Sequence, residues 1–317
     1  MTRDHLLPTT TEVMVRIGVT LNEHDGPDAL SRLTEDLQRA HDDGIASVWM
    51  SHIFGMDALT ALAVAAGRVP DVEVGTAVVP IFTRHPVALA QQARTAALAA
   101  GPGRLTLGIG LSHRVIVEDL LGCSFERPLR HMDEYLSVLL PLLDEGAASF
   151  SGATVRTQVR LTTPGNGRLP VLLGALGPRM LTLAAERTEG TVLWMTGPIT
   201  VRDHVVPTLA AAAQAAGRPA PRVVCVLPVG VTDDSDGAYT RAAMAFRTYG
   251  SLPSYRAMID REGVAGPADL AVIGDEDAVG TKLDEFVKAG VTDFVAVEFL
   301  TGADAVRTRS FLGSLAT

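Results

Sequence analysis

Segments with the composition of buried strands alternate with segments of helical periodicity along almost the whole chain of 317 residues. A helix after each strand returns the chain to the same edge of a sheet, so this alternation produces a parallel sheet. Eight strands in such an order close into a barrel with the helices outside. We therefore predict a single-domain (β/α)8 TIM barrel with insertions over residues 13–317. The predicted strands are residues 13–21, 47–51, 72–79, 104–110, 170–174, 191–194, 223–231 and 293–299.

The predicted helices follow these strands. In residues 27–43, one helical stripe is formed by Leu30, Leu33, Leu37 and Ala40, at the spacing of a helix with one buried face. Two parts depart from the simple repeat: residues 150–163 alternate as in a hairpin or an extended excursion, and two helices are inserted after the seventh strand. The other outer helices are predicted at residues 56–67, 128–145, 201–216, 278–289 and 303–315 and from Pro86 and Pro178 onward, and the inserted ones at 237–250 and 254–262.

Composition narrows the classes of function. Hydrophobic residues make up 47% of the chain, enough for a barrel core and a ring of helices. A net charge of −9 disfavours nucleic acid as a partner, because a phosphate backbone selects a basic surface. The N-terminus has no apolar core of signal-peptide length, and no apolar run reaches the ~18 residues of a membrane span. We expect a cytoplasmic protein that contacts no membrane, with residues 1–12 as a flexible tail.

Several familiar chemical motifs are missing from the sequence. Cys123 and Cys225 are too far apart for a metal motif, and we predict two free thiols and no metal site. Gly108-Ile109-Gly110 lacks the third glycine of a dinucleotide-binding fingerprint, which disfavours a Rossmann domain. The sequence also contains no nucleophile elbow and no Walker loop.

Polar residues cluster where the predicted strands end, which is where barrel enzymes carry their working residues. At each position a structural or solvated residue is the alternative. We take His52 and His113 as candidate catalytic residues, because imidazole titrates near neutral pH and suits proton transfer. The clustered residues are Ser51 and His52 after the second strand, Arg84 and His85 after the third, and Ser112 and His113 after the fourth.

The fifth predicted strand ends in a glycine-rich turn, Gly174-Ala175-Leu176-Gly177-Pro178-Arg179. A helix begins in this turn, and its free backbone N–H groups and positive dipole end suit a phosphate. Arg179 adds charged donors. The turn therefore predicts a phosphate-binding loop, with ordinary helix-start chemistry as the alternative.

Five segments, taken together in their order and spacing, resemble the luciferase-like monooxygenase superfamily. They are residues 49–52, 75–92, 108–113, 174–190 and 273–298. Within that superfamily the chain is similar to the deazaflavin (coenzyme F420)-dependent reductases and dehydrogenases. The resemblance implies that the cofactor is coenzyme F420, with FMN as the alternative.

The resemblance also implies roles for individual residues. A histidine matching His52 lies beside the reactive face of the cofactor, although several relatives have an acidic residue where this chain has Ser51. A non-prolyl cis peptide and a bulge are expected at Thr76-Ala77, behind the middle ring of the cofactor. His113 stands where some relatives have a carboxylate that transfers a proton. The remaining implied cofactor contacts are Ser51, Arg84, His85, Gly110, Ser112, Gly174, Ala175, Gly177, Pro178 and Arg179.

A deazaflavin has carbon where a flavin has N5, so it transfers hydride and does not readily activate oxygen. The expected function is therefore hydride transfer between reduced deazaflavin and an unsaturated small molecule containing C=C, C=N or C=O. His52 is the first candidate for proton transfer and His113 the second. An FMN-dependent monooxygenase of the same fold and a non-catalytic flavin-binding barrel are the alternatives.

The second and third predicted helices are rich in alanine and nearly free of charge. Outer barrel helices normally present charged residues to water, and a large apolar surface usually marks an interface. We therefore predict a homodimer that packs through these two helices, with Ala65 and Ala97 as outward positions. The resemblance points the same way, because related oxidoreductases commonly dimerise through this region.

Overall fold

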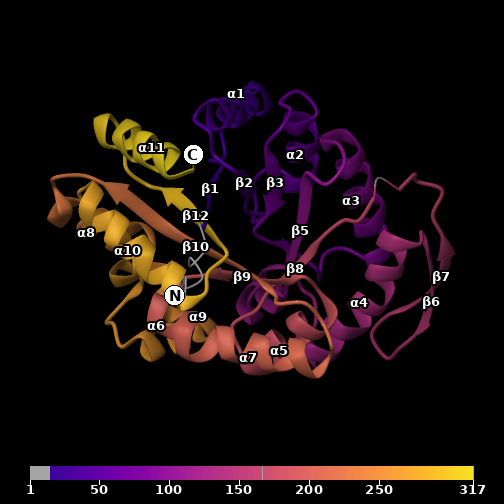
Figure 1. Ribbon diagram of the computed structural model, residues 1–317. Helices are drawn as coiled ribbons and strands as arrows, with labels where there is room; N and C mark the ends of the chain where they lie inside the picture. The colour runs from indigo at the N-terminus through magenta and orange to yellow at the C-terminus, as the bar shows by residue number, and fades with distance from the viewer. Residues whose placement is uncertain (1–14, 166, 317) are drawn as a thin grey trace, which may run out of the picture.

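Parallel strands close into a barrel at the centre of the computed structural model, which describes residues 15–165 and 167–316 (Figure 1). β1 pairs in parallel with β2 on one side and with β12 on the other, so the sheet has no open edge at this point. The predicted (β/α)8 barrel is confirmed. Its strands are β1 (Arg16–Thr20), β2 (Ser47–Met50), β3 (Glu73–Thr76), β5 (Leu105–Gly110), β8 (Val171–Gly174), β9 (Gly190–Trp194), β10 (Arg222–Val231) and β12 (Asp293–Glu298).

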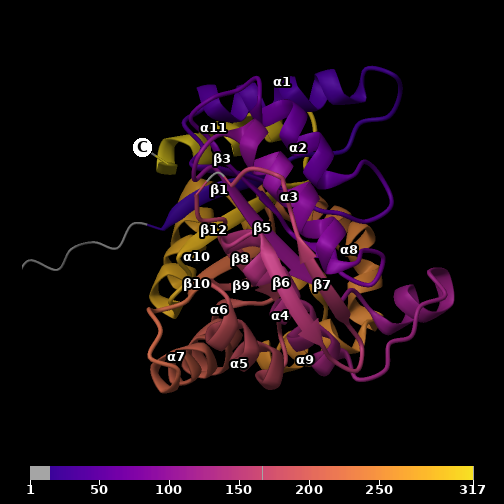
Figure 2. The ribbon, with the colours of Figure 1, turned by 90° about the vertical axis from the view of Figure 1, so that its right-hand side faces the viewer.

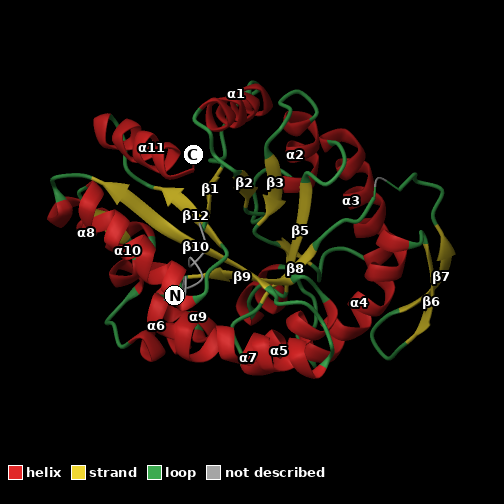
Figure 3. Ribbon diagram, viewed as in Figure 1, coloured by secondary structure: helices red, strands yellow, loops and turns green. Residues whose placement is uncertain are grey.

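Helices surround the strands on all sides (Figure 3). Figure 1 and Figure 2 both show α1 and α11 on one side of the barrel and α5 and α7 on the opposite side. In α1 the buried stripe consists of Leu33, Leu37 and Ala40. Leu30 was predicted to belong to this stripe, but it is 40% exposed. The outer helices are α1 (Ala29–Asp42), α2 (Ala58–Ala66), α3 (Pro86–Ala100), α4 (Pro128–Asp144), α5 (Pro178–Arg187), α7 (Val206–Ala215), α10 (Glu276–Ala289) and α11 (Ala303–Ala316).

The predicted hairpin is present as β6 (Ala147–Ser151) and β7 (Arg156–Arg160), an antiparallel pair that lies outside α4 (Figure 1). The carboxylate of Glu134 on α4 holds its turn by accepting hydrogen bonds from the backbone N–H groups of Ala153, Thr154 and Val155. A pair of strands this short is marginal without such support. The hairpin begins earlier than predicted, because Ala147 and Ala148 already pair.

The helical segments that follow β9 and β10 each consist of more separate helices than predicted. The helix expected at residues 201–216 is preceded by a short turn of helix and changes hydrogen-bond period within its length. The expected insertion after β10 is present. The elements are α6 (Pro198–Thr200), the π-helix η2 (Val201–Val205), α8 (Ser235–Ala245), η3 (Arg247–Ser251) and α9 (Pro253–Glu262). Three further elements were not predicted: η1 (Ile116–Leu120), η4 (Pro267–Leu270) and β11 (Val272–Gly274), which pairs in parallel with the last residues of β10.

The inside of the barrel is filled with side chains. An inner cluster is formed by Trp49, Leu172, Val192, Val224, Val226 and Val295. The indole of Trp49 is fully buried, and it fits because Gly75 faces it: a Cβ on that glycine would lie 2.5 Å from the ring. A separate and larger core lies between the strands and the helices.

An ion-pair network closes the amino-terminal end of the barrel. Arg222 of β10 binds Asp293 of β12 at 2.8 Å and Glu73 of β3 at 2.9 Å, and Arg16 of β1 binds the same two carboxylates. The guanidinium of Arg222 also lies 5.5 Å from the centre of the Trp49 ring. The Asp293 side chain is only 2% exposed. The network therefore joins four strands and separates the inner cluster from water.

Two predictions concern other parts of the chain. The flexible tail predicted at residues 1–12 lies outside the described residues. Among the described residues, none of the helices has the length and apolarity needed to cross a membrane.

Candidate active site

The carboxyl ends of the barrel strands surround an apolar floor. Ala77, Val78, Trp194 and Val297 are partly buried and pack on the inner cluster. They come from the segment after β3, from β9 and from β12. A flat organic ring that binds at the mouth of the barrel would rest on these side chains.

The floor is shaped by a bulge between β3 and β4 (Val79–Pro80). Gly75 pairs with Thr106 of β5, and Val79 pairs with Ile109, so this strand advances four positions while its neighbour advances three. Within the bulge, the peptide bond between Ala77 and Val78 is cis. The bulge thus lies where it was expected, whereas the cis bond is one peptide later than the expected Thr76-Ala77.

Three residues predicted to contact a cofactor also make close contacts within the barrel. The Thr76 hydroxyl is buried, donates to the Gly108 carbonyl oxygen at 2.8 Å and accepts from the Gly108 N–H at 2.9 Å. A Cβ on Gly110 would lie 2.6 Å from Cγ2 of Val78, and one on Gly174 would lie 3.3 Å from it. Both glycines therefore leave room for Val78, the central side chain of the floor.

A polar network surrounds His52 at one side of the mouth. Nδ1 of His52 accepts a hydrogen bond from the backbone N–H of Ala58, at 3.1 Å, where α2 begins. Nε2 lies 3.1 Å from Nη2 of Arg84, and Arg84 in turn donates to Asp57 at 2.5 Å. Gln92 of α3 donates to the other oxygen of Asp57 at 2.7 Å. The structure therefore brings His52 and Arg84 together. The sequence predicted each of them as a site residue but did not predict that they are in contact.

Charge and burial set the ionisation of this network. Burial lowers the pKa of His52 from 6.5, the Arg84 guanidinium lowers it further, and Asp57 opposes them. For Asp57, burial would raise the pKa, but hydrogen bonds from Thr60, Gln92 and Arg84 lower it to about 2. At neutral pH the network therefore holds a neutral imidazole, a guanidinium and a carboxylate.

His113 lies in an aromatic environment. Its ring centre is 5.1 Å from that of Tyr255, and burial lowers its pKa from 6.5. Ser112 before it has a φ of +59°, a left-handed conformation that is uncommon for serine. The string of ring contacts continues from Tyr255 through Tyr249, Trp194 and Phe246 to Phe299, with centres 5.4–5.9 Å apart. The inserted helices thus bring aromatic rings to the mouth, as far as the end of β12.

The glycine-rich turn leads from β8 into α5 as predicted. Ala175 is buried, Gly177 is the residue before the helix, and Pro178 and Arg179 are its first two residues. Arg179 is exposed and lines a groove of about 390 Å³ between α4 and α5, together with Arg130, Asp133 and Glu186. The backbone of the turn lies at the carboxyl ends of the strands, whereas the Arg179 side chain lines the outer groove.

Two further residues predicted to contact the cofactor are Ser51 and His85. Ser51 is partly buried and directly precedes His52. His85 is exposed and its Nδ1 accepts a hydrogen bond from the Val87 N–H at 3.3 Å, which caps the start of α3.

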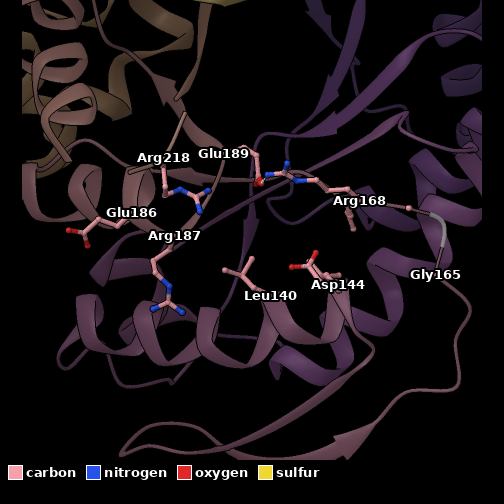
Figure 4. A pocket seen from close by; sticks show the side chains of 11 residues that line it. Leu140, Asp144, Gly165, Arg168, Glu186, Arg187, Glu189 and Arg218 are labelled. Carbon is pink, nitrogen blue, oxygen red and sulfur yellow. Dashed lines mark hydrogen bonds and ion pairs between the residues drawn. The ribbon is translucent and has the colours of Figure 1, made fainter. Parts of the chain in front are cut away.

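A cavity of about 660 Å³ lies at the opposite end of the barrel (Figure 4). Its residues directly precede β8, β9 and β10 or end α4 and α5, so it contains none of the predicted site residues. Figure 4 shows Arg168 directed toward Glu189, and these two side chains form an ion pair. Arg168, Arg187 and Arg218 are balanced by Asp144, Glu186 and Glu189. Residues at this end of such barrels usually contribute to stability, and we assign the cavity to that role.

The sequence matches a known family over most of its length. A family profile described as luciferase-like monooxygenase matches residues 9–293. The chain belongs to the luciferase-like monooxygenase family. The family predicted from five sequence segments is thereby confirmed.

Relatives of this luciferase-like chain include a protein named for coenzyme F420 and a reductase named for its methanopterin substrate. A putative coenzyme F420-dependent oxidoreductase of Mycobacterium tuberculosis is 32% identical over 169 residues, which cover 48% of this chain and 47% of that protein. A 5,10-methylenetetrahydromethanopterin reductase of Archaeoglobus fulgidus is 26% identical over 81% of this chain and 86% of its own length. The first match therefore spans about half of each protein, and the second most of both.

Solved structures share the luciferase-like barrel. The coenzyme F420-dependent tetrahydromethanopterin reductase of Methanopyrus kandleri superposes with a TM-score of 0.81 at 21% identity, over 94% of this chain and 97% of that one. An F420-dependent secondary alcohol dehydrogenase gives a TM-score of 0.79 at 18% identity, over 95% and 98%. At these identities the likeness establishes the fold.

Asp57 and Gln92 complete the polar network of the candidate site, and neither was predicted from the sequence to belong to it. Asp57 looks like an ordinary helix cap, and it does accept a hydrogen bond from the Thr60 N–H. Its second function becomes visible only when Arg84, 27 positions away, folds against it. A polar residue on the inner side of α3, where apolar residues are expected, is the one sequence signal that could have identified Gln92.

Proposed function

We propose that this luciferase-like protein is a coenzyme F420-dependent oxidoreductase that transfers hydride between the reduced deazaflavin and an unsaturated small molecule. The observation that carries the proposal is the pairing of an apolar floor, Ala77 and Val78, with the polar network of His52 at the same mouth. The names of the relatives support the cofactor.

The residues at the mouth fit a deazaflavin. The small side chain of Ala77 and the partly exposed Val78 offer an apolar surface for a flat ring. The N-terminal backbone of α5 offers N–H groups and a positive dipole end for a phosphate, at the same end of the barrel. When bound, F420 supplies a hydride donor or acceptor. The chain itself would hold the ring, exclude water with the aromatic side chains and polarise the substrate.

An anaerobic assay tests this function. Purified protein and reduced F420 are mixed with small ketones, enones and imines, and the absorbance of oxidised F420 is followed. We expect substrate-dependent oxidation of the deazaflavin. Oxygen-dependent product formation with reduced FMN, and none with F420, would instead favour the monooxygenase alternative. No turnover with either cofactor would favour the non-catalytic barrel.

Replacing Arg179 by alanine is expected to weaken F420 binding by about 1.5–3 kcal/mol, the contribution of a charged hydrogen bond. This corresponds to a roughly 10- to 150-fold higher Kd. The exposed Arg179 side chain has no ion-pair partner among the described residues. It is therefore free to turn from the outer groove toward a phosphate bound at the start of α5. Fluorescence titration measures the Kd, with the exposed Arg32→Ala on α1 as the control. An unchanged Kd for Arg179→Ala would place the phosphate elsewhere.

We also propose a homodimer through α2 and α3. The single arginine of α3, Arg94, points inward and donates to the carbonyl oxygens of Leu142, Leu143 and Thr163. The outer face of α3 is therefore uncharged: it consists of Ala88, Gln91, Thr95, Leu98 and Ala99. Ala65 and Ala97, taken as outward from the sequence, are buried in the chain, because α2 and α3 pack on each other there.

Light scattering tests the dimer. At micromolar concentration we expect twice the chain mass of 33.4 kDa, because two helices a side can bury more than about 1,000 Å². Leu98→Glu, at a side chain that is 40% exposed, should give the mass of one chain, and Val306→Glu on the distant α11 should not. A wild-type mass near 33.4 kDa would refute the dimer.

A further inference from the structure

The position of the proton on His52 follows from its hydrogen bond to Ala58. A backbone N–H can only donate, so Nδ1, 3.1 Å from the Ala58 nitrogen, must accept and carries no proton. The proton of the neutral ring is then on Nε2. Ala58 is the first residue of α2, and the positive end of the helix dipole disfavours a second proton on the ring.

Nε2 of His52 faces a second donor. Nη2 of Arg84 lies 3.1 Å away, and a guanidinium has donors only. Two N–H groups therefore converge with no acceptor between them. Neither nitrogen satisfies the other in this arrangement.

Arg84 is held in this position from three sides. Nη2 donates to Asp57 at 2.5 Å, Nε lies 3.3 Å from the Gln92 amide oxygen, and Nη1 lies 3.3 Å from the Thr83 hydroxyl. Gln92 also fixes Asp57 at 2.7 Å. The Arg84 and His52 side chains are 19% and 13% exposed, so little water reaches them. The convergence of the two donors is thus built into the fold, and not an accident of two mobile side chains.

We propose that His52 and Arg84 form a two-donor site for the oxygen of a carbonyl substrate, and that the substrate is a ketone or aldehyde, or the corresponding alcohol in the reverse direction. An oxygen about 2.8 Å from both nitrogens completes a triangle on their 3.1 Å separation. This inference rests on the proposed function and selects C=O among the three substrate classes expected there. An alkene carbon offers no acceptor, and an imine nitrogen has one lone pair, whereas a carbonyl oxygen has two and can accept from both donors.

The site stabilises the charge that the reaction creates. Hydride adds to the carbonyl carbon, the π electron pair of C=O moves to the oxygen, and the oxygen becomes an alkoxide. The Nε2–H of His52 and the Nη2–H of Arg84 bind that alkoxide, which then takes its proton from water to give the alcohol. His52 keeps its own proton, because losing it would leave an imidazolate. His52 therefore acts as a neutral hydrogen-bond donor, and not in the proton-transfer role predicted from the sequence.

The groups that face the imidazole agree with this role. They are the Arg84 guanidinium beside Nε2, the Ala58 N–H on Nδ1, and the Asp57 carboxylate 3.9 Å from Nδ1. Burial and Arg84 lower the pKa of His52 and Asp57 opposes them. A neutral histidine held at the N-terminus of a helix polarises the substrate carbonyl in the same way in triosephosphate isomerase.

Nuclear magnetic resonance of the apo protein with ¹⁵N-labelled histidine tests the proton position without any cofactor. We expect His52 to be neutral at pH 7 and above, protonated at Nε2 and unprotonated at Nδ1. Arg84→Met removes a cation beside the ring, so the pKa of His52 should rise, and Arg32→Met should leave it unchanged. The same spectra report whether each variant is folded. A proton on Nδ1, or a charged ring at pH 7, would overturn the inference.

Kinetics with reduced F420 test the substrate class. Arg84→Met should lower kcat for a ketone by about 10²-fold, the usual loss for one oxyanion donor, with a smaller change in KM. His52→Gln places an amide N–H near the position of Nε2 and should retain more activity than His52→Asn, which cannot reach it. Turnover of an alkene or imine but no ketone would contradict the inference. If F420 does not bind at all, the proposed function fails, while the apo spectra still decide the position of the proton.

Discussion

Replacing Asp293 by alanine is expected to lower the free energy of unfolding by about 3–5 kcal/mol, because it leaves the guanidinium of Arg222 half-buried with one carboxylate partner fewer. Asp293 is 2% exposed and accepts from both Arg222 and Arg16. Urea denaturation at pH 7 followed by circular dichroism measures the change. The exposed Asp284→Ala on α10 is the matched control and should change stability by less than about 0.5 kcal/mol. Equal midpoints for the two variants would contradict the assigned role of the network.

The contribution of Asp293 to the free energy of unfolding depends on pH. Burial alone would raise its pKa, but the hydrogen bond and charge of Arg222, with the charge of Arg16, lower it below 3.8 overall. A carboxyl whose pKa is lower in the folded state stabilises the fold above its unfolded pKa, and the contribution is lost as pH falls through the folded value. The difference in stability between wild type and Asp293→Ala should therefore be full above about pH 5 and shrink below about pH 4.

The second large effect concerns turnover. His52→Ala is expected to lower kcat by about 10²-fold or more while the Kd of F420 changes little, because the imidazole acts on the reacting atoms. The loss should appear in hydride transfer measured by stopped-flow absorbance in a single turnover. His41→Ala is a suitable control, because His41 lies in the last turn of α1, toward the amino-terminal end of the barrel. Wild-type turnover in His52→Ala would remove this residue from the mechanism.

Most of the strands and helices could be predicted from short-range patterns in the sequence. The strands from residue 47 onward differ from their predicted bounds by a few residues at most, because runs of β-branched residues and the glycines and prolines that end them act over short distances. The short β11 and the π-helix η1 were missed because three or five residues hold too little periodicity to detect. The division of strand three at the bulge was expected from the resemblance and not from the pattern.

Side-chain partners were harder to predict, because they depend on contacts between distant segments. Gly110 and Gly174 suggested an approach to a cofactor, yet both make room for Val78 of another strand. The sequence of α3 did not show which way its single arginine points, and Arg94 turns inward to the end of α4. The network of His52 joins residues 52, 57, 84 and 92. Their separations match no helical or strand period, so nothing in the sequence indicated that they meet.

The proposed chemistry requires that a deazaflavin binds at the mouth of this barrel. Titration of the purified protein with coenzyme F420 and, separately, with FMN measures it directly by the change in fluorescence of each cofactor. We expect saturable binding of F420 with a lower Kd than that of FMN. FMN that co-purifies with the protein, together with no saturable change on addition of F420, would contradict it.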